Sequence, residues 1–279
     1  MGIIKNLIFR WDRVITPVIP TPVDNSIIFY STSVANPLSA YVTGNTGAAI
    51  DWTVTGGLTI ATVTGDFPNL DFSTNVGVGV VTVENITAVN FLAIQNCEIT
   101  DIFIPDIIGV TTLTLSNNLL TNFSLNSHPS ITHLVISNMP SLTSLDVSGN
   151  TLLTHLEAQN TGLSGVYSFT TNTNIDFINL GQNIGVTGIV TTGLTSLTRI
   201  RCFYSSINSL DISTNVNITA LEIQGNSFSS TLTNQVLADL VANNKTNGDL
   251  HYRNNETGQG VTDRATLVSR GWTITNYGT

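Results

Sequence analysis

The fold of this chain is decided by stretches such as residues 134–158, which read LVISNMPSLTSLDVSGNTLLTHLEA. The apolar pair Leu134/Ile136 returns 22 residues later as Leu156/Ala158. Copies of this pair are Leu92/Ile94, Leu113/Leu115, Leu134/Ile136, Leu156/Ala158, Ile178/Leu180, Ile200/Cys202 and Leu221/Ile223. Successive copies are 21, 21, 22, 22, 22 and 21 residues apart, and so regular a spacing indicates a repeat protein.

A second period is interleaved with the first. Another apolar group follows each pair after about ten residues, as Ile102/Ile104, Phe123/Leu125, Leu145/Val147, Val166/Phe169, Ile189 and Leu210/Ile212. A small or amide side chain often stands five residues after the first member of a pair, as Cys97, Asn118, Thr161, Asn183, Ser205 and Asn226. Two periods that stay in phase over several turns predict coils stacked upon one another.

The alternation within each pair predicts a short strand. Leu113 and Leu115 fall on one side of such a strand, and Thr112 and Thr114 fall on the other. One coil cannot bury its apolar side alone, whereas a stack of coils can. We expect the asparagines at offset five to hydrogen-bond the turn backbone of neighbouring coils. The remaining half of each coil is too short for a long helix, so we expect it to be extended or 3₁₀.

These copies resemble the leucine-rich repeat family, whose frame is LxxLxLxxN/C followed by a variable half. The resemblance covers at least residues 90–226, and Leu145–Asn150 and Leu210–Asn215 carry the LDxSxN half typical of short bacterial surface repeats. The departures from the frame are Met139, Ala158 and Cys202. The resemblance implies a leucine-rich-repeat solenoid, a β-rich α/β horseshoe or superhelix with a parallel concave β-sheet and a mostly non-helical convex side.

Both ends of the chain depart from the repeat. Thr233–Asn243 has the apolar spacing of a helix, a second short helix is expected over Thr262–Arg270, and Leu250 recovers the frame 29 residues after Leu221. The prolines of Thr16–Pro22 favour an extended linker. The predicted division is 1–22, an N-terminal arm and proline-containing linker; 23–90, a β-rich N-terminal cap or irregular early repeats; 91–228, the leucine-rich repeats; and 229–279, C-terminal capping repeats with two helices.

Composition excludes several classes of protein. The 279 residues include 9 Lys and Arg against 18 Asp and Glu, a net charge of −9. This balance argues against a nucleic-acid partner, which requires a basic surface. No stretch approaches the ~18 apolar residues of a membrane-spanning helix, and the apolar runs near Met1 are too short for a secretory signal. We therefore expect neither a membrane span nor an export signal within this sequence.

The sequence lacks motifs of catalysis. No GxxxxGK[ST], HExxH, GxSxG or CxxC pattern occurs, and the carboxylates stand singly. We expect no enzymatic activity and no cofactor. Cys97 and Cys202 are five coils apart, which is roughly 24 Å at ~4.8 Å per strand and too far for a disulfide. Both are expected to be buried free thiols.

The distribution of charge singles out one predicted strand. No Lys or Arg occurs between Arg13 and Arg199. Arg199, Arg201 and Phe203 then occupy consecutive outward positions of one concave strand, and Glu222 falls beside Arg201 on the next strand. Arg and aromatic side chains are enriched in binding hot spots.

Two histidines precede this strand in the same phase. His155 and Glu157 lie two coils earlier and His133 one coil further back, so the imidazoles are expected to stack at about 5 Å. The candidate ligand-binding residues are His133, His155, Glu157, Arg199, Arg201, Phe203 and Glu222. The alternative is that these are solvated ladder positions, with Arg201–Glu222 a weak cross-strand pair. We assign no metal, because two imidazoles lack the further ligands that zinc takes.

The resemblance implies recognition rather than catalysis, and the Thr- and Asn-rich composition is that of a surface outside a cell. The first hypothesis is a non-enzymatic recognition or adhesion module on a virion surface, such as a bacteriophage fibre, spike or decoration protein. Its concave sheet would bind a host-surface protein or glycan, and its N-terminal arm would contact other virion proteins. The alternatives are a bacterial cell-surface, extracellular leucine-rich repeat adhesin and a purely structural virion protein.

Overall fold

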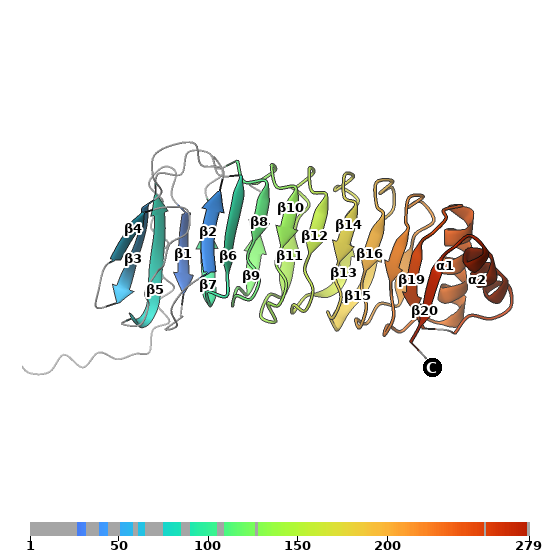
Figure 1. Cartoon of the computed structure of the whole chain (residues 1–279). Helices are drawn as coiled ribbons and strands as arrows, with labels where there is room; N and C mark the ends of the chain where they lie inside the picture. The colour runs from blue at the N-terminus through green and yellow to red at the C-terminus, as the bar shows by residue number, and fades with distance from the viewer. Residues whose placement is uncertain are drawn as a thin grey trace, which may run out of the picture.

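The computed structural model describes the backbone of residues 27–31, 39–43, 51–57, 61–64 and 75–84, and the backbone and side chains of residues 90–104, 109–125, 128–253 and 255–277. These residues form an elongated body along which the strands follow one another nearly in chain order (Figure 1). The expected arm and linker, residues 1–22, lie outside the described residues. No helix in the described part of the chain is both long enough and apolar enough to cross a bilayer.

A mainly antiparallel sheet lies at the N-terminal end. Its order is β4-β3-β5-β1-β7, and its strands are β1 (Ile27–Ser31), β3 (Asp51–Gly57), β4 (Ala61–Thr64), β5 (Asn75–Glu84) and β7 (Ile99–Phe103). The β1–β5, β1–β7, β3–β4 and β3–β5 pairs are all antiparallel, unlike the stacked coils that follow. The N-terminal region is therefore β-rich, as expected, while its extent as a separate unit stays a prediction.

The main feature is a ten-stranded sheet, which we call the long sheet. Its first strand, β2 (Ser39–Thr43), pairs antiparallel with β6, and all later pairs are parallel. The parallel strands are β6 (Phe91–Gln95), β8 (Thr112–Thr114), β10 (His133–Val135), β12 (His155–Glu157), β14 (Phe177–Asn179), β16 (Arg199–Arg201), β18 (Ala220–Glu222), β19 (Asp249–Tyr252) and β20 (Thr273–Asn276).

The register of the long sheet follows the repeat. Leu113 pairs with Leu134, Leu134 with Leu156, and Leu221 with Leu250, so equivalent residues of successive coils lie side by side. All five of these leucines have no exposed surface. The predicted solenoid and parallel sheet are confirmed, including the recovery of the frame at Leu250.

The opposite side of the coils is extended, as predicted. It carries β9 (Asn122–Ser124) paired with β11 (Ser144–Asp146), and a second sheet of β13 (Ser164–Ser168), β15 (Gly185–Val190) and β17 (Ser209–Asp211). Phe169 is buried, but Val166 of the same apolar group is 63% exposed. The strand register shifts between Gly165 and Val166, and this irregularity turns the valine outward.

Asparagine ladders close the coils on both sides of the stack. Asn118 accepts hydrogen bonds from the amides of Cys97 and Ile99, and donates to the carbonyls of Ile94 and Leu115. The same role falls to Asn183 and Asn226, which confirms the prediction for offset five. A second ladder on the opposite side consists of Asn150, Asn172 and Asn215.

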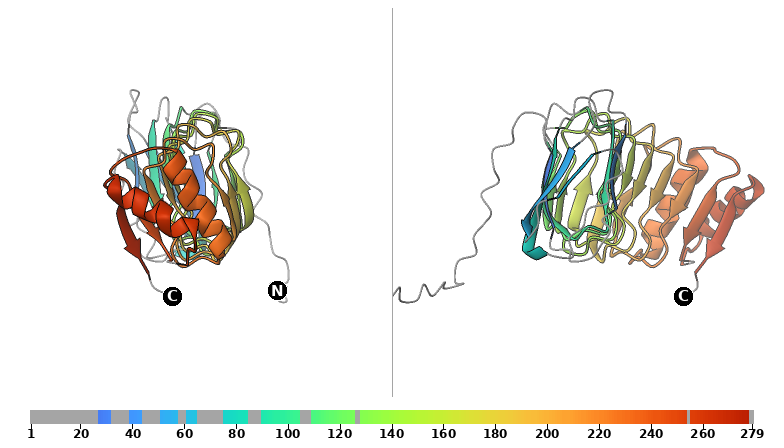
Figure 2. Two further views of the ribbon diagram at one scale, coloured as in Figure 1. Left: turned by 90° about the vertical axis from the view of Figure 1, so that its right-hand side faces the viewer. Right: turned by 60° about the vertical axis from the view of Figure 1, so that its left-hand side comes forward.

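Two helices cover the C-terminal end of the stack (Figure 2). They are α1 (Ser230–Ala242) and α2 (Gln259–Ser269), so a helical cap is present as predicted. The first helix begins before the expected Thr233, because the Ser229 side chain accepts a hydrogen bond from the Leu232 amide and caps it. The buried carboxylate of Glu256 pairs with Arg264 at 2.7 Å and links α2 to the loop before it.

Candidate functional site

Four side chains stack across adjacent strands of the long sheet. We call them the aromatic column: His133 on β10, His155 on β12, Phe177 on β14 and Arg199 on β16. The ring centroids of His133 and His155 are 5.5 Å apart with 21° between their planes, and those of His155 and Phe177 are 4.5 Å apart. The Arg199 guanidinium carbon lies 5.8 Å from the centroid of Phe177. The predicted stacking of the two histidines is confirmed.

Sequence analysis did not select Phe177. It stands 22 residues after His155 and 22 before Arg199, so the repeat phase alone places it between them. It could have been found by reading each outward position down all the coils. Phe177 is 9% exposed, because its neighbours in the column cover both faces of its ring.

Two close polar contacts flank the aromatic column. Nε2 of His155 lies 2.9 Å from Oε1 of Glu157, along one strand. Nε of Arg201 lies 2.9 Å from Oε1 of Glu222, across neighbouring strands. The expected cross-strand pair is therefore present. Arg199 has no such partner among the carboxylates of the described residues, and it and Arg201 are the only Lys or Arg in residues 91–228.

Phe203 lies beyond the strand to which sequence analysis assigned it. Strand β16 ends at Arg201, and Phe203 belongs to the following turn. Its side chain nevertheless stays on the outward face, where Arg201 stacks over the ring at 5.3 Å. The ring also packs against Gly181, at which a Cβ atom would lie 2.7 Å from the phenyl group. Gly181 thus gives Phe203 its place on the neighbouring coil.

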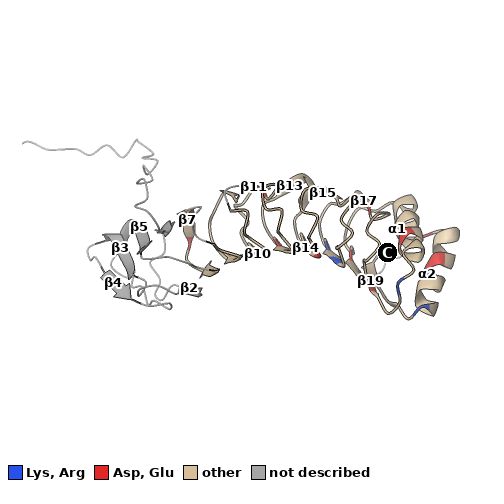
Figure 3. Ribbon diagram, turned by 90° about the horizontal axis from the view of Figure 1, so that it is seen from above, with Lys and Arg blue, Asp and Glu red and all other residues tan. Residues whose placement is uncertain are grey.

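An open hollow of about 370 Å³ lies over β12, β14 and β16. Its lining residues are His155, Glu157, Asp176, Phe177, Thr198, Arg199, Arg201 and Thr219. Of the predicted site residues, the hollow thus brings together His155, Glu157, Arg199 and Arg201. His133, Phe203 and Glu222 lie beside it through their contacts and do not line it. Figure 3 shows the few basic residues gathered here and in the C-terminal cap.

Sequence analysis missed three polar residues of this hollow. These are Asp176, Thr198 and Thr219, each of which immediately precedes a strand of the long sheet. Strand-centred reasoning passes over such positions, although they fall in phase with one another at 22 and 21 residues. The Thr198 hydroxyl donates to the Asp176 carbonyl at 3.1 Å, which holds neighbouring coils together at this edge.

The thiol of Cys202 is buried beneath the long sheet and is not activated as a nucleophile. Cys97 and Cys202 are both free and buried, as predicted. Burial, with a smaller contribution from the charge of Glu222, raises the pKa of Cys202 to about 12. Because the thiolate is the nucleophilic form, this cysteine is not equipped for nucleophilic catalysis at neutral pH.

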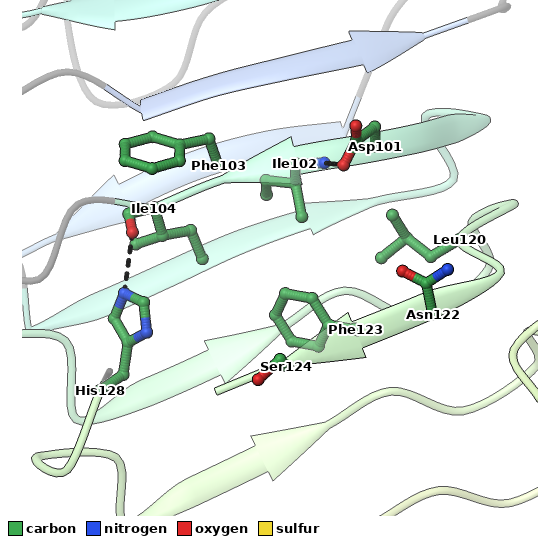
Figure 4. Close-up of a pocket in the computed structure, with 9 residues that line it drawn as sticks. All are labelled: Asp101, Ile102, Phe103, Ile104, Leu120, Asn122, Phe123, Ser124 and His128. Atoms are coloured by element: carbon green, nitrogen blue, oxygen red, sulfur yellow. Dashed lines mark hydrogen bonds between the residues drawn. The ribbon is translucent and has the colours of Figure 1, made fainter. Parts of the chain in front are cut away.

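The opposite side of the coils carries a different hollow, of about 250 Å³, between β7 and β9 (Figure 4). Ile102, Leu120 and Phe123 line it, and Nε2 of His128 bonds the Ile104 carbonyl at 2.9 Å. This histidine is buried and is held by the backbone. This hollow is lined by apolar and polar side chains but by no Lys or Arg, so the long sheet, which carries Arg199 and Arg201, is the better candidate for recognition of an anionic group.

Comparisons with known proteins were made for the whole chain. No family model and no curated protein matches it. Solved structures that are similar include the functional domain of InlJ from Listeria monocytogenes, at 25% identity over 65% of this chain and 43% of that one, with a TM-score of 0.45. A leucine-rich repeat protein of Leptospira interrogans matches at 16% identity over 63% of this chain and 52% of that one, with a TM-score of 0.46.

A Listeria monocytogenes internalin, InlF, also matches, at 14% identity over 68% of this chain and 81% of that one, with a TM-score of 0.27. The first two matches span about half or less of the proteins concerned. The assignment rests on the molecule itself: leucines at a period of 21 or 22 residues pair side by side in a parallel sheet, and an asparagine ladder closes each turn. This chain therefore has the fold of a leucine-rich repeat solenoid.

Proposed function

We propose that this chain is a non-enzymatic recognition module that binds a partner through the outward face of the long sheet. The observation that carries the proposal is the coincidence, on β12 to β16, of the aromatic column, a hollow and the only basic residues of the repeats. Aromatic and arginine side chains held rigidly by their neighbours supply binding energy at small entropic cost.

The alternative, that these are solvated ladder positions, accounts less well for the column. Exposed residues of a sheet need only tolerate water, and Thr112 and Thr114 serve that purpose on β8. Phe177 and Arg199 instead stack in a place where a threonine would suffice for folding. Whether the module is displayed on a virion or on a bacterial cell stays a prediction, and so do its partner and the attachment role of residues 1–22.

The test compares a site variant with a control variant on the opposite side. The site variant is Arg199→Ala/Arg201→Ala/Phe203→Ala. The control is Asn122→Ala/Ser144→Ala/Val166→Ala, which alters exposed residues of β9, β11 and β13. Circular dichroism and thermal unfolding establish that both are folded.

Labelled proteins are then incubated with intact cells of a bacterial panel and of an animal epithelial line, and bound fluorescence is measured. We expect saturable binding of the wild type and the control to at least one cell type, and at least a tenfold loss in the site variant. Saturable binding that survives in the site variant, or none by the wild type to any cell tested, contradicts the proposal. A site variant that loses self-association instead, by sedimentation, supports the structural alternative.

A further inference from the structure

We propose that the hollow over β12, β14 and β16 binds a saccharide that carries a single carboxylate, such as a terminal sialic or uronic acid. This inference rests on the proposed function and names the chemistry of its ligand.

The anionic group of the ligand follows from Arg199. Its neighbour Arg201 is neutralised by Glu222 at 2.9 Å, whereas Arg199 has no carboxylate partner in the described part of the chain. The stack on Phe177 orients the guanidinium at the rim of the hollow. A planar guanidinium held in this way offers two parallel N–H donors, the geometry that a carboxylate accepts best.

The hydroxyl-rich part of the ligand follows from the remaining lining. Two carboxylates, Glu157 and Asp176, and two hydroxyls, Thr198 and Thr219, line the hollow together with the arginines. The side chain of Asp176 is exposed and makes no hydrogen bond or ion pair with a described residue. Interleaved donors and acceptors on so small a surface match vicinal hydroxyl groups, each of which donates and accepts one hydrogen bond.

The same carboxylates exclude a polyanion. The chain carries a net charge of −9, and Glu157 and Asp176 line the hollow together with Arg199, the one arginine of the lining that has no carboxylate partner among the described residues. A sulfated polymer or a nucleic acid would place several negative charges against these two acids. A ligand with one carboxylate and several neutral hydroxyls would place its carboxylate against Arg199 and its hydroxyls against the neutral or hydrogen-bond-accepting groups of the lining.

The shape favours a saccharide over an acidic peptide. At about 370 Å³ the hollow lies near the lower end of the range of small-molecule sites. A peptide anchor requires a pocket for an apolar side chain, and the one phenyl ring of the lining, Phe177, is 9% exposed because the column covers its faces. The hollow therefore offers mainly polar contacts.

The test uses sialyllactose and a glucuronic acid disaccharide as probes, with the methyl ester of sialyllactose, neutral lactose, heparin and an acidic hexapeptide for comparison. Binding to the folded wild type is measured by saturation-transfer NMR and calorimetry. We expect at least one acidic sugar to bind, and neutral lactose, the methyl ester, heparin and the peptide to bind at least tenfold more weakly than that sugar.

Two substitutions separate the site from general charge effects. Arg199→Gln is expected to weaken binding of the acidic sugar at least tenfold. Arg253→Gln removes one exposed arginine from the C-terminal cap and is expected to leave binding within twofold. Equal binding of sialyllactose and its methyl ester, or equal losses in the two variants, overturns the inference.

Preferential binding of the acidic peptide or of heparin overturns it as well. Failure of every acidic sugar to bind, in a protein that still attaches to cells through the long sheet, overturns this inference and leaves the proposed function standing. If the wild type shows no specific attachment to cells, in contrast, that result counts against the proposed function itself.

Discussion

The side-chain oxygen of Asn183 lies 2.8 Å from the backbone nitrogen of Thr161 and 2.7 Å from its hydroxyl oxygen, and both groups donate to it. The amide nitrogen of the same asparagine donates to the carbonyls of Ala158 and Leu180, at 2.8 Å each. One buried side chain therefore satisfies polar groups on two successive coils. The stack depends on such bonds because water does not reach these turns.

The substitution Asn183→Ala is expected to lower the free energy of unfolding by about 3–5 kcal/mol, because it leaves several buried backbone groups without a partner. Urea titration followed by circular dichroism measures the change. The matched control is Asn174→Ala, which removes one bond of an exposed asparagine to the Thr151 carbonyl and should cost less than about 1 kcal/mol. Similar losses in both variants would contradict the role assigned to the ladder.

A glycine substitution tests the turn geometry. Gly225 has a φ of +71°, and a Cβ atom there would overlap the ring of Tyr204 on the preceding coil. Gly193 has a φ of +82° but open space around the same position. Both Ala variants carry the left-handed backbone cost of about 1–2 kcal/mol, and only Gly225→Ala carries the overlap in addition. We expect its melting temperature to fall further than that of Gly193→Ala, and the reverse order would refute this reading of the turn.

The thiol of Cys202 should be unreactive until the protein unfolds. With a pKa of about 12, about one thiol in ten thousand is ionised at pH 8, and the group is buried. We expect the reaction with a thiol reagent at pH 8 to proceed at the rate of unfolding. Introducing an exposed cysteine by Ser164→Cys should add one promptly reacting thiol. Two promptly reacting thiols in the native wild type would show that these cysteines are accessible.

Asp239 of α1 and Asp211 of β17 should respond to pH in opposite directions. Burial raises the pKa of Asp239, so the folded state holds this proton more tightly and stability falls as pH rises through the raised value. Hydrogen bonds from Ser213 lower the pKa of Asp211, so its contribution is present above the ordinary value and is lost as pH falls.

Asp239→Asn is therefore expected to raise the melting temperature at pH 7 by about 2–4 °C, which corresponds to roughly 1 kcal/mol, and by less at pH 3. Asp211→Asn should lower it at pH 7 and have a smaller effect at pH 3. Thermal unfolding of both variants at the two pH values provides the comparison. A pH-independent effect of Asp239→Asn would show that the carboxylate is not penalised by its burial.

Much of the fold follows from residues that repeat. Leu134 and Leu156 predict a strand, its inward face and its neighbour in the sheet, since phase alone fixes these three properties. The second asparagine ladder was harder to predict. Asn150 and Asn215 were visible in the LDxSxN half, but their hydrogen bonds run to the preceding coil, whose path depends on the convex strands.

In the candidate site too, the repeat spacing predicts some features, whereas others depend on how the turns pack. The stacking of His133 and His155 follows from their separation of 22 residues. The position of Phe203 beyond the strand does not, because it depends on the space left by Gly181 on the preceding coil. Asp176 and Thr198 line the hollow, but the sequence does not predict this. Side chains that flank a strand have no fixed alternation, so their direction depends on the path of the turns.

Parallel pairing at one spacing has a consequence for how far this protein extends. Each strand of the long sheet touches only its neighbours, so an additional 22-residue turn inserted between β8 and β10 would shift the hollow by about 4.8 Å from the N-terminal end without altering its lining. The length of the solenoid and the lining of the hollow are therefore set by different coils. Adding or removing whole coils would change the length of the solenoid and leave the residues that line the hollow unchanged.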